Sequence, residues 1–256
     1  MKIGIIVLLA VLCSACATGV QQENTQGNAA PTLRFQNPAL APGNGGRQIT
    51  WADLQSGDIL LSATNGVTSA GIRLVTLAPV SHASLYIGNR EIVEAVGSGV
   101  RRRTLAATLE EEAVVAAFRH PRLTPEQAER VRAFALEKVG SRYDHVGIML
   151  QAPFSLERKL CELPLMPDAA RSACLMGIAS IQLGTASNDR FFCSQLVLEA
   201  YRQAGLPITE ADPRWVSPAD ILHMREGDVP SMKIHQALLY VGHLKMSAEN
   251  TVAHAN

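Results

Sequence analysis

Short apolar stretches bounded by polar or turn-forming residues predict four β-strands in the first half of the chain. The stretches are 58–62, 82–87, 91–96 and 113–118. Residues 88–90, Gly-Asn-Arg, lie between the second and third stretches and are of types that favour tight turns. We therefore expect the second and third strands to form an antiparallel hairpin.

Helical periodicity and helix-start signals predict helices around and after these strands. The clearest helix follows Thr124, with a proline at its first position and a capping-box Gln127, and Gly140 ends it after about Val139. The other predicted helices cover 68–77, 168–183 and 193–204, and a short one follows Ser217-Pro218. Helices that flank a mainly antiparallel set of strands indicate an α+β fold.

The N-terminal segment has the features of an export signal. Residues 1–15 combine an early Lys2 with an apolar run much shorter than the roughly 20 residues needed to span a bilayer. The sequence Leu-Cys-Ser-Ala-Cys that ends at Cys16 resembles the lipobox of bacterial lipoproteins, in which the cysteine carries the lipid. Ala17 rather than Asp follows, which by the same resemblance implies outer-membrane retention, facing the periplasm. The alternative is an ordinary signal peptide with two incidental cysteines.

The rest of the chain divides by composition into a tether, one domain and a tail. Residues 16–48 are rich in Gln, Asn, Gly and Pro, so we expect a lipid anchor followed by a flexible tether. Residues 49–243 have the length of a single domain, within which 151–189 is an apparent insertion. Residues 244–256 are expected to be a disordered tail.

Composition and charge exclude two classes of protein and name no partner. The chain is 47% apolar and 18% charged, and 23 basic residues balance 23 acidic ones. Removing Lys2 with the signal leaves one net negative charge. A disordered protein would be less hydrophobic with a large net charge, and a nucleic-acid-binding protein would show a basic excess. We therefore expect a globular protein with no nucleic-acid partner.

Common catalytic motifs are absent from the sequence. It contains no phosphate-binding glycine loop, no Gly-Xaa-Ser-Xaa-Gly and no His-Glu-Xaa-Xaa-His. No group of residues has metal-ligand spacing either, so we expect no metal and no cofactor. The candidate chemistry therefore lies with the cysteines.

The five cysteines divide by position. Cys13 lies in the signal, and Cys16 is assigned to the lipid. Cys161 and Cys174 lie in the same insertion, and in an oxidising compartment they are the natural disulfide pair. Cys193 is left over, and an unpaired thiol in an exported protein is a candidate nucleophile.

The position of Cys193 favours reactivity. It stands at or next to the start of the helix predicted over 193–204, where backbone amides and the helix dipole favour the thiolate. The same amides could hold the oxyanion of a tetrahedral intermediate. The alternative is that Cys193 is only a small buried hydrophobic residue.

His82 and Glu94 are the candidate partners of this thiol. His82 begins a predicted strand, and Glu94 lies in the next strand across the hairpin turn. A carboxylate in an otherwise apolar strand needs a partner, and both residues are about equally far from the turn, so their side chains can meet. Glu94 would then orient the imidazole and stabilise its cationic form. The alternative is an edge-strand glutamate in water and a structural histidine.

Several blocks of the sequence, taken in order, resemble one known family. The blocks are 57–61, 80–88, 92–95, 140–144, 192–197 and 217–220. They are similar to the YaeF/YiiX permuted papain-like enzymes of the NlpC-type superfamily, which also contains the lecithin retinol acyltransferase relatives. In permuted members the histidine strand precedes the cysteine helix, as here. The resemblance covers about 54–223 and implies a circularly permuted papain-like fold, with a small antiparallel sheet or half-barrel flanked by helices.

The resemblance also implies roles for individual residues. The implied nucleophile is Cys193, the implied general base is His82, and the implied orienting residue is Glu94. We expect substrate contacts from Tyr143, Asp144 and Ser194. The insertion 151–189 has no counterpart that can be placed on the family pattern.

These roles imply covalent catalysis on a carbonyl, in which the Cys193 thiolate attacks an amide or ester and the acyl-enzyme passes to water or another acceptor. Three settings stay open. Cell-wall peptides suit an anchored periplasmic enzyme of the NlpC type. Lipid acyl groups suit the acyltransferase relatives and the membrane tether, with the helix over 68–77 as an apolar entrance. The third setting is a non-catalytic lipoprotein that binds an envelope ligand.

Overall fold

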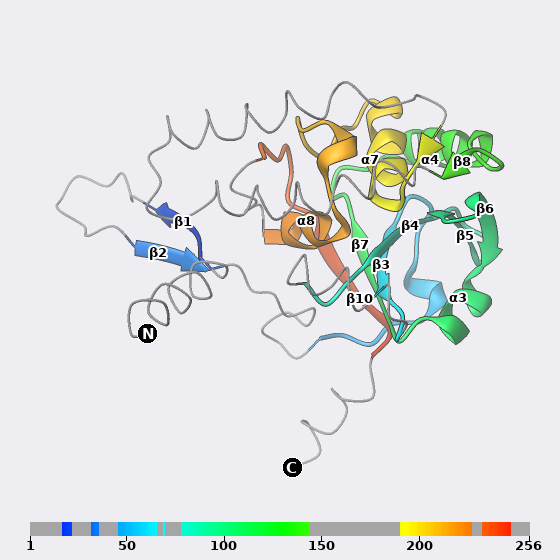
Figure 1. Cartoon of the computed structure of the whole chain (residues 1–256), viewed down its shortest axis with the longest axis horizontal. Coiled ribbons are helices and arrows are strands. Elements are labelled where there is room, and N and C mark those ends of the chain that lie inside the picture. The colour runs from blue at the N-terminus through cyan, green and yellow to red at the C-terminus, as the bar shows by residue number, and fades with distance from the viewer. Residues whose placement is uncertain are drawn as a thin grey trace, which may run out of the picture.

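The computed structural model describes residues 17–21, 32–35, 46–65, 69, 78–143, 190–226 and 232–246 of the chain (Figure 1). Its main element is a six-stranded antiparallel sheet in the order β10-β7-β3-β4-β5-β6. The strands are β3 (Ile59–Ala63), β4 (His82–Tyr86), β5 (Glu91–Val96), β6 (Gly99–Thr104), β7 (Val114–Arg119) and β10 (Leu239–Lys245). The four strands predicted from the sequence are all present.

Helices join these strands or pack on the sheet. They are α3 (Leu105–Glu111), α4 (Pro125–Glu137), α7 (Cys193–Gln203) and α8 (Pro218–His223), with 3-10 turns η1 (Trp51–Asp53), η2 (Pro213–Trp215) and η3 (Met224–Glu226). The helices predicted after Thr124, at 193–204 and after Ser217 are confirmed, and capping boxes begin the first and last of them. The helices predicted over 68–77 and 168–183 lie outside the described residues, apart from a helical Ser69.

The predicted hairpin joins β4 to β5 through a tight turn. Asn89 and Arg90 occupy its centre with φ of 53° and 59°, the left-handed conformation that a two-residue hairpin turn requires. Glu91 N–H closes the turn on Gly88 O at 3.0 Å. The Arg90 guanidinium lies 3.7 Å from the ring centroid of Trp51, a contact that holds the strained arginine in place.

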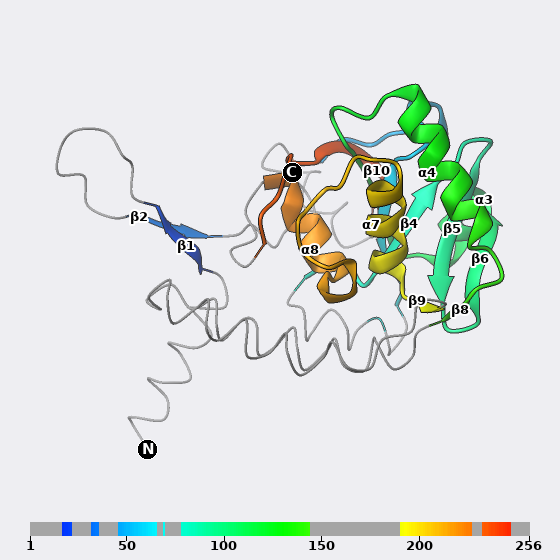
Figure 2. The same ribbon diagram turned by 90° about the horizontal axis from the view of Figure 1, so that it is seen from above.

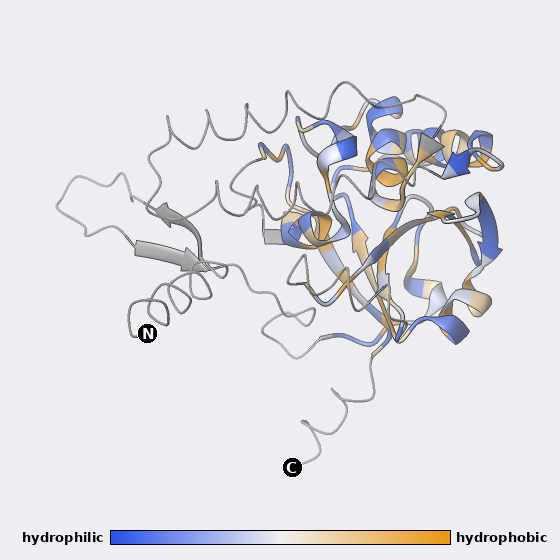
Figure 3. Cartoon of the chain, in the orientation of Figure 1, coloured by the Kyte–Doolittle hydropathy of each residue, from blue (hydrophilic) through white to orange (hydrophobic). Residues whose placement is uncertain are grey.

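Alternating residues of the strands divide the core into two layers. In β3, Ile59 and Leu61 face the larger layer, where the buried faces of α4 and α7 pack, whereas Leu60 faces a smaller layer closed by α3. Figure 2 shows α7 lying over the sheet between α4 and α8, and Figure 3 shows hydrophobic residues concentrated along the central strands. A strand with both faces buried explains why residues 59–61 are all apolar.

A buried ion pair ties the start of β3 to the end of β7. The Asp58 side chain has no exposed surface and accepts from Arg119 Nε and Nη2 at 2.6 Å each. Arg119 Nη2 also donates to the carbonyl of Asp53 at 2.9 Å. The neighbouring Gly57 carbonyl accepts from the Tyr201 hydroxyl at 2.6 Å, which fastens α7 to the same point. The Gly-Asp pair that begins the sequence resemblance is therefore an anchor of the fold.

Some elements differ from the sequence expectation. Strand β6 carries Arg101, Arg102 and Arg103 in succession, which hides its alternation, and β10 is interrupted by irregular register. Strand β10 also runs to Lys245, so the expected tail boundary at 244 is wrong by two residues. Within the expected tether, β1 (Ala17–Gln21) pairs with β2 (Thr32–Phe35) as a short antiparallel hairpin.

Short parallel strands bring two distant blocks of the sequence together. Strand β8 (Arg142–Tyr143) pairs with β9 (Arg190–Phe191), and Tyr143 lies opposite Phe191. Phe191 is two residues before Cys193, so the Tyr143 block sits beside the start of α7. In the part of the chain that the structure describes, no helix combines the length and hydrophobicity needed to span a bilayer.

Candidate active site

Cys193 is the first residue of α7 and is a free, buried thiol with 4% of its surface exposed. Phe192 precedes it in an extended conformation, and the Phe192 amide donates to the Gln195 side chain at 3.4 Å. The thiol therefore lies at the positive end of the helix dipole. The expected position at a helix start is confirmed.

The surroundings of Cys193 favour its ionised form. Burial by itself raises the pKa of the thiol, but the hydrogen bond to His82 and its positive charge bring that pKa below the ordinary value. The backbone at Ala83 and Ser194 also hydrogen-bonds to the sulfur, which acts in the same direction. Cys193 therefore has the electropositive surroundings of a reactive cysteine rather than those of an inert core residue.

His82 is the first residue of β4 and links the thiol to Glu94. Its Nε2 lies 2.8 Å from Glu94 Oε2, which leaves Nδ1 as the ring nitrogen for Cys193. Burial lowers the pKa of His82, but hydrogen bonds to Cys193 and Glu94 raise it to about 10. Burial likewise raises the pKa of Glu94, while His82 and Arg101 lower it to about 2. The geometry favours the charged form of all three groups: a thiolate at Cys193, an imidazolium at His82 and a carboxylate at Glu94.

The contact between His82 and Glu94 is diagonal across the hairpin. Glu94 lies directly opposite Ser84, and His82 is two residues farther from the turn than Ser84, so the expectation that His82 and Glu94 are about equally far from the turn is wrong by two residues. His82 and Glu94 still meet because residues two apart on a strand share a face, and long side chains span the diagonal.

Sequence reasoning missed the residues on the far side of Glu94. Arg101 in β6 is the direct cross-strand partner of Glu94, and its Nε donates to Glu94 Oε1 at 2.9 Å. Arg103 reaches the same oxygen at 3.4 Å. The sequence feature that could have indicated these two residues is the run of arginines that follows Glu94 after a short glycine-containing turn.

A second buried carboxyl, Glu112, was also missed. It is 5% exposed, burial raises its pKa, and Oε2 has no hydrogen-bond partner among the described residues. His82, Glu94 and Arg103 all act on it electrostatically. The site therefore contains two carboxyl groups in different environments, one ionised and one with a raised pKa.

The expected substrate contacts have different outcomes. Ser194 has no exposed surface, and its hydroxyl donates to Val216 O at 2.5 Å, so this side chain is engaged inside the protein instead of facing a substrate. Tyr143 is half-buried beside Phe191. Asp144, the lipidation residue Cys16 and the expected disulfide pair Cys161 and Cys174 lie outside the described residues.

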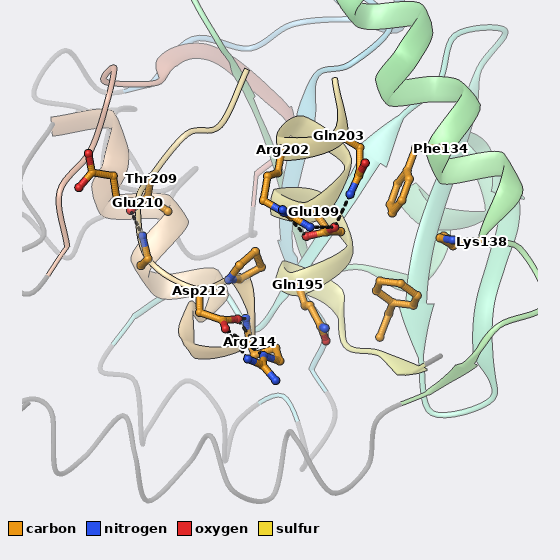
Figure 4. A pocket seen from close by; sticks show the side chains of 13 residues that line it. Phe134, Lys138, Gln195, Glu199, Arg202, Gln203, Thr209, Glu210, Asp212 and Arg214 are labelled. Carbon is orange, nitrogen blue, oxygen red and sulfur yellow. Dashed lines mark hydrogen bonds and ion pairs between the residues drawn. The ribbon is translucent and has the colours of Figure 1, made fainter. Parts of the chain in front are cut away.

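A polar pocket of about 710 Å³ lies along α7 from Gln195 to Gln203, and Cys193, His82 and Glu94 are not among its lining residues (Figure 4). Its aromatic side is formed by Phe134 and Phe191. Figure 4 shows two ion pairs on its walls, Glu199 with Arg202 and Asp212 with Arg214. Its other lining residues are Lys138, Gln195, Gln203, Thr209, Glu210, Ala211 and Pro213. A pocket of this size holds a small ligand, and its charged groups suit a polar one.

The described residues contain no group of three or more His, Cys, Asp or Glu side chains arranged to hold a metal ion. What these residues do bring together is a thiol, an imidazole and a carboxylate, the kinds of group that covalent acyl transfer uses.

The paired charges predict an unusual pH dependence for the thiol. An ordinary thiol loses reactivity toward iodoacetamide as the pH falls below its pKa of about 8.5. We expect Cys193 instead to keep a nearly constant rate as the pH falls through neutral, because the His82 imidazolium stabilises the thiolate. Peptide-level mass spectrometry of alkylation between acid and neutral pH measures this rate at Cys193 alone. A midpoint near the ordinary thiol pKa would show that the ion pair does not form.

Comparisons with known proteins place these features in context. No protein-family model matches the chain. The chain is 36% identical over 244 residues to the "Probable lipoprotein peptidase YaeF" of Escherichia coli K12, covering 92% of this chain and 89% of that protein. Among solved structures it is similar to the metalloprotein yiiX of Escherichia coli O157:H7, with 21% identity and a TM-score of 0.42 over 73% of this chain and 96% of that one.

Proposed function

This chain belongs to the YaeF/YiiX-type family, and we propose that it is a cell-envelope cysteine hydrolase that cleaves amide bonds of cell-wall-type peptides through a Cys193 acyl-enzyme. The observation that carries this proposal is the row formed by Cys193, His82 and Glu94, in which a helix-start thiol meets an imidazole held at 2.8 Å by a buried carboxylate. A relative named as a peptidase supports the same reaction class.

The reaction follows from the charges in this row. The Cys193 thiolate attacks the substrate carbonyl carbon, and backbone amides in the first turn of α7 stabilise the oxyanion that forms. The His82 imidazolium then donates its proton to the leaving amine, and the carbon–nitrogen bond breaks. In the second half the neutral imidazole takes a proton from water, and the resulting hydroxide releases the acid from sulfur. Glu94 keeps the ring oriented and stabilises its cationic form throughout.

Peptide substrates are favoured over lipid acyl chains by the relative that is named as a peptidase. The pocket beside α7 does not decide between these substrates, because Cys193, His82 and Glu94 are not among its lining residues. The apolar entrance expected at 68–77 for a lipid lies outside the described residues. Lipid acyl hydrolysis or transfer is therefore the second candidate.

A membrane-anchored location fits this substrate. The relative is named as a lipoprotein, and we propose that Cys16 is likewise acylated and holds the enzyme at the outer membrane, facing the periplasm. The domain would then stand next to the cell wall at the end of a short anchor segment. No protein partner and no cofactor enter the proposed reaction.

Products released from purified envelope fractions test the proposal. We expect the mature protein to release soluble peptides, with no change in the lipid-linked pool, because the relative named as a peptidase favours a peptide substrate. Mass spectrometry of both pools measures this, with Cys193→Ala as the matched control. Changes confined to the lipid pool would assign the acyl alternative. Products at the control level in both pools would contradict hydrolysis and leave a binding lipoprotein.

A further inference from the structure

Glu94 is a fully engaged carboxylate at the centre of three neighbouring strands. Its side chain is 2% exposed, Oε2 faces His82 in β4, and Oε1 faces β6. Arg101 approaches Oε1 with Nε at 2.9 Å and Nη2 at 2.8 Å, so both of its donors meet one oxygen. Arg103 adds a third donor at 3.4 Å. The two carboxylate oxygens therefore contact different strands, Oε2 a residue of β4 and Oε1 residues of β6.

The strand register explains why these two arginines reach Glu94 and the one between them does not. Arg101 pairs directly with Glu94, and Arg103 pairs with Ile92 on the same face of the sheet. Arg102 lies on the opposite face, 54% exposed, and forms an ion pair with Glu91 at 3.2 Å. Three consecutive arginines therefore have two different environments.

We propose that Arg101 and Arg103 are positioning residues that clamp Oε1 of Glu94, so that Oε2 is fixed on the His82 ring and the ring faces Cys193. This role rests on the proposed cysteine chemistry and extends it to a fourth and fifth residue. Neither arginine touches the reacting atoms; both act through Glu94.

The clamp has a clear physical purpose. A buried carboxylate bound by one imidazole alone can rotate about its terminal torsion, whereas donors from β6 fix the carboxylate plane. Arg103 is itself held by Glu111, with Nη2 and Oε1 2.9 Å apart, and is only 11% exposed. The arginine forks are preorganised, so little conformational freedom is lost for each bond.

The clamp also sets the charge around the thiol. The groups that face this region are Cys193 from α7, His82 from β4, Glu94 from β5, Arg101 and Arg103 from β6, Glu111 from α3, and the buried Glu112 after it. Removing one arginine takes away a positive charge and leaves the carboxylate less compensated. Both changes raise the pKa of the thiol, because they disfavour an additional negative charge.

The test is the pH dependence of Cys193 alkylation by iodoacetamide. The acid limb of this profile is the range in which the alkylation rate falls as the thiolate is protonated. In Arg101→Gln we expect the acid limb to move to higher pH by about half to one unit, and we expect a shift in the same direction in Arg103→Gln. The matched control is Arg102→Gln, whose limb should move by less than about 0.2 unit because its charge is exposed on the other face. Thermal unfolding of each variant identifies any loss of folding.

A conservative variant separates positioning from bulk charge. Arg101→Lys should keep the acid limb near its wild-type position, because the charge is retained, yet lower the plateau rate by about 3- to 10-fold because the two-donor contact is lost. A merely structural arginine would change the unfolding temperature and leave the profile of the folded protein unmoved.

The outcomes separate this inference from the proposed function. Equal profiles for Arg101→Gln and the wild type, or equal shifts in Arg101→Gln and Arg102→Gln, would overturn the clamp. Alkylation needs no substrate, so a shifted profile without any product from envelope fractions would retain the clamp and reject the hydrolase. Products from envelope fractions without a shifted alkylation profile would retain the hydrolase and reject the clamp.

Discussion

His82→Ala is expected to slow the labelling of Cys193 by a thiol-directed acylating probe by about 10²–10⁴-fold at neutral pH. The imidazolium is the group that brings the pKa of this buried thiol below its ordinary value. Without it, only the backbone hydrogen bonds at Ala83 and Ser194 oppose the effect of burial on the thiol pKa, so we expect the protonated thiol to dominate. In the proposed reaction His82 also protonates the leaving amine, so peptide hydrolysis should fall at least as far.

Labelling is measured from the initial rate of probe incorporation in the mature protein, with Cys193→Ala as the background. An exposed histidine outside the site, His235, provides the matched control, and His235→Ala should label at the wild-type rate. Equal labelling of His82→Ala and wild type would mean that the thiol is activated without the imidazole, and the dyad would have to be abandoned.

Arg119→Ala is expected to produce the largest loss of stability, about 3–5 kcal/mol, because it leaves the fully buried Asp58 without its cation. Arg119 also donates to the carbonyl of Asp53, so β3, β7 and η1 lose a common attachment. Urea unfolding at neutral pH measures the change. Arg132→Ala, which breaks an exposed pair with Glu129, should change stability by less than about 1 kcal/mol.

The pH dependence of this loss distinguishes charge from packing. Burial raises the pKa of Asp58 even in the presence of Arg119, and removing the cation raises it further. The variant can therefore protonate Asp58 as pH falls, so its deficit should be smaller at acid pH and grow as pH rises through the Asp58 pKa. A deficit that is constant between pH 4 and pH 8 would indicate lost packing instead.

The site could be assembled in outline from local patterns. Cys193 was recognisable because an odd cysteine stood at a helix start, and Glu94 because a carboxylate interrupts an apolar strand. Arg101 and Arg103 were not recognisable, because three consecutive arginines conceal strand alternation and only pairing shows which of them shares a face with Glu94. Glu112 follows α3 directly, and no periodicity marks a residue there as buried.

Ser194 illustrates the limit of proximity in sequence. It follows Cys193 directly, but the helical rotation of about 100° per residue turns its hydroxyl toward Val216 and away from Cys193. The carbonyl that receives this hydroxyl is 22 residues away, and no local signal indicates it.

Four features could be predicted from the amino-acid sequence alone: the α+β class, the β4–β5 hairpin, the helix that begins at Cys193, and the order of the histidine strand before the cysteine helix. They follow from side-chain periodicity and turn chemistry over short stretches of chain. The tertiary structure decided the diagonal contact of His82 with Glu94, the clamp from β6 and the ion pair of Asp58 with Arg119. These contacts depend on strand register and on which strands become neighbours. Both are set by the burial of the whole sheet, not by any single segment.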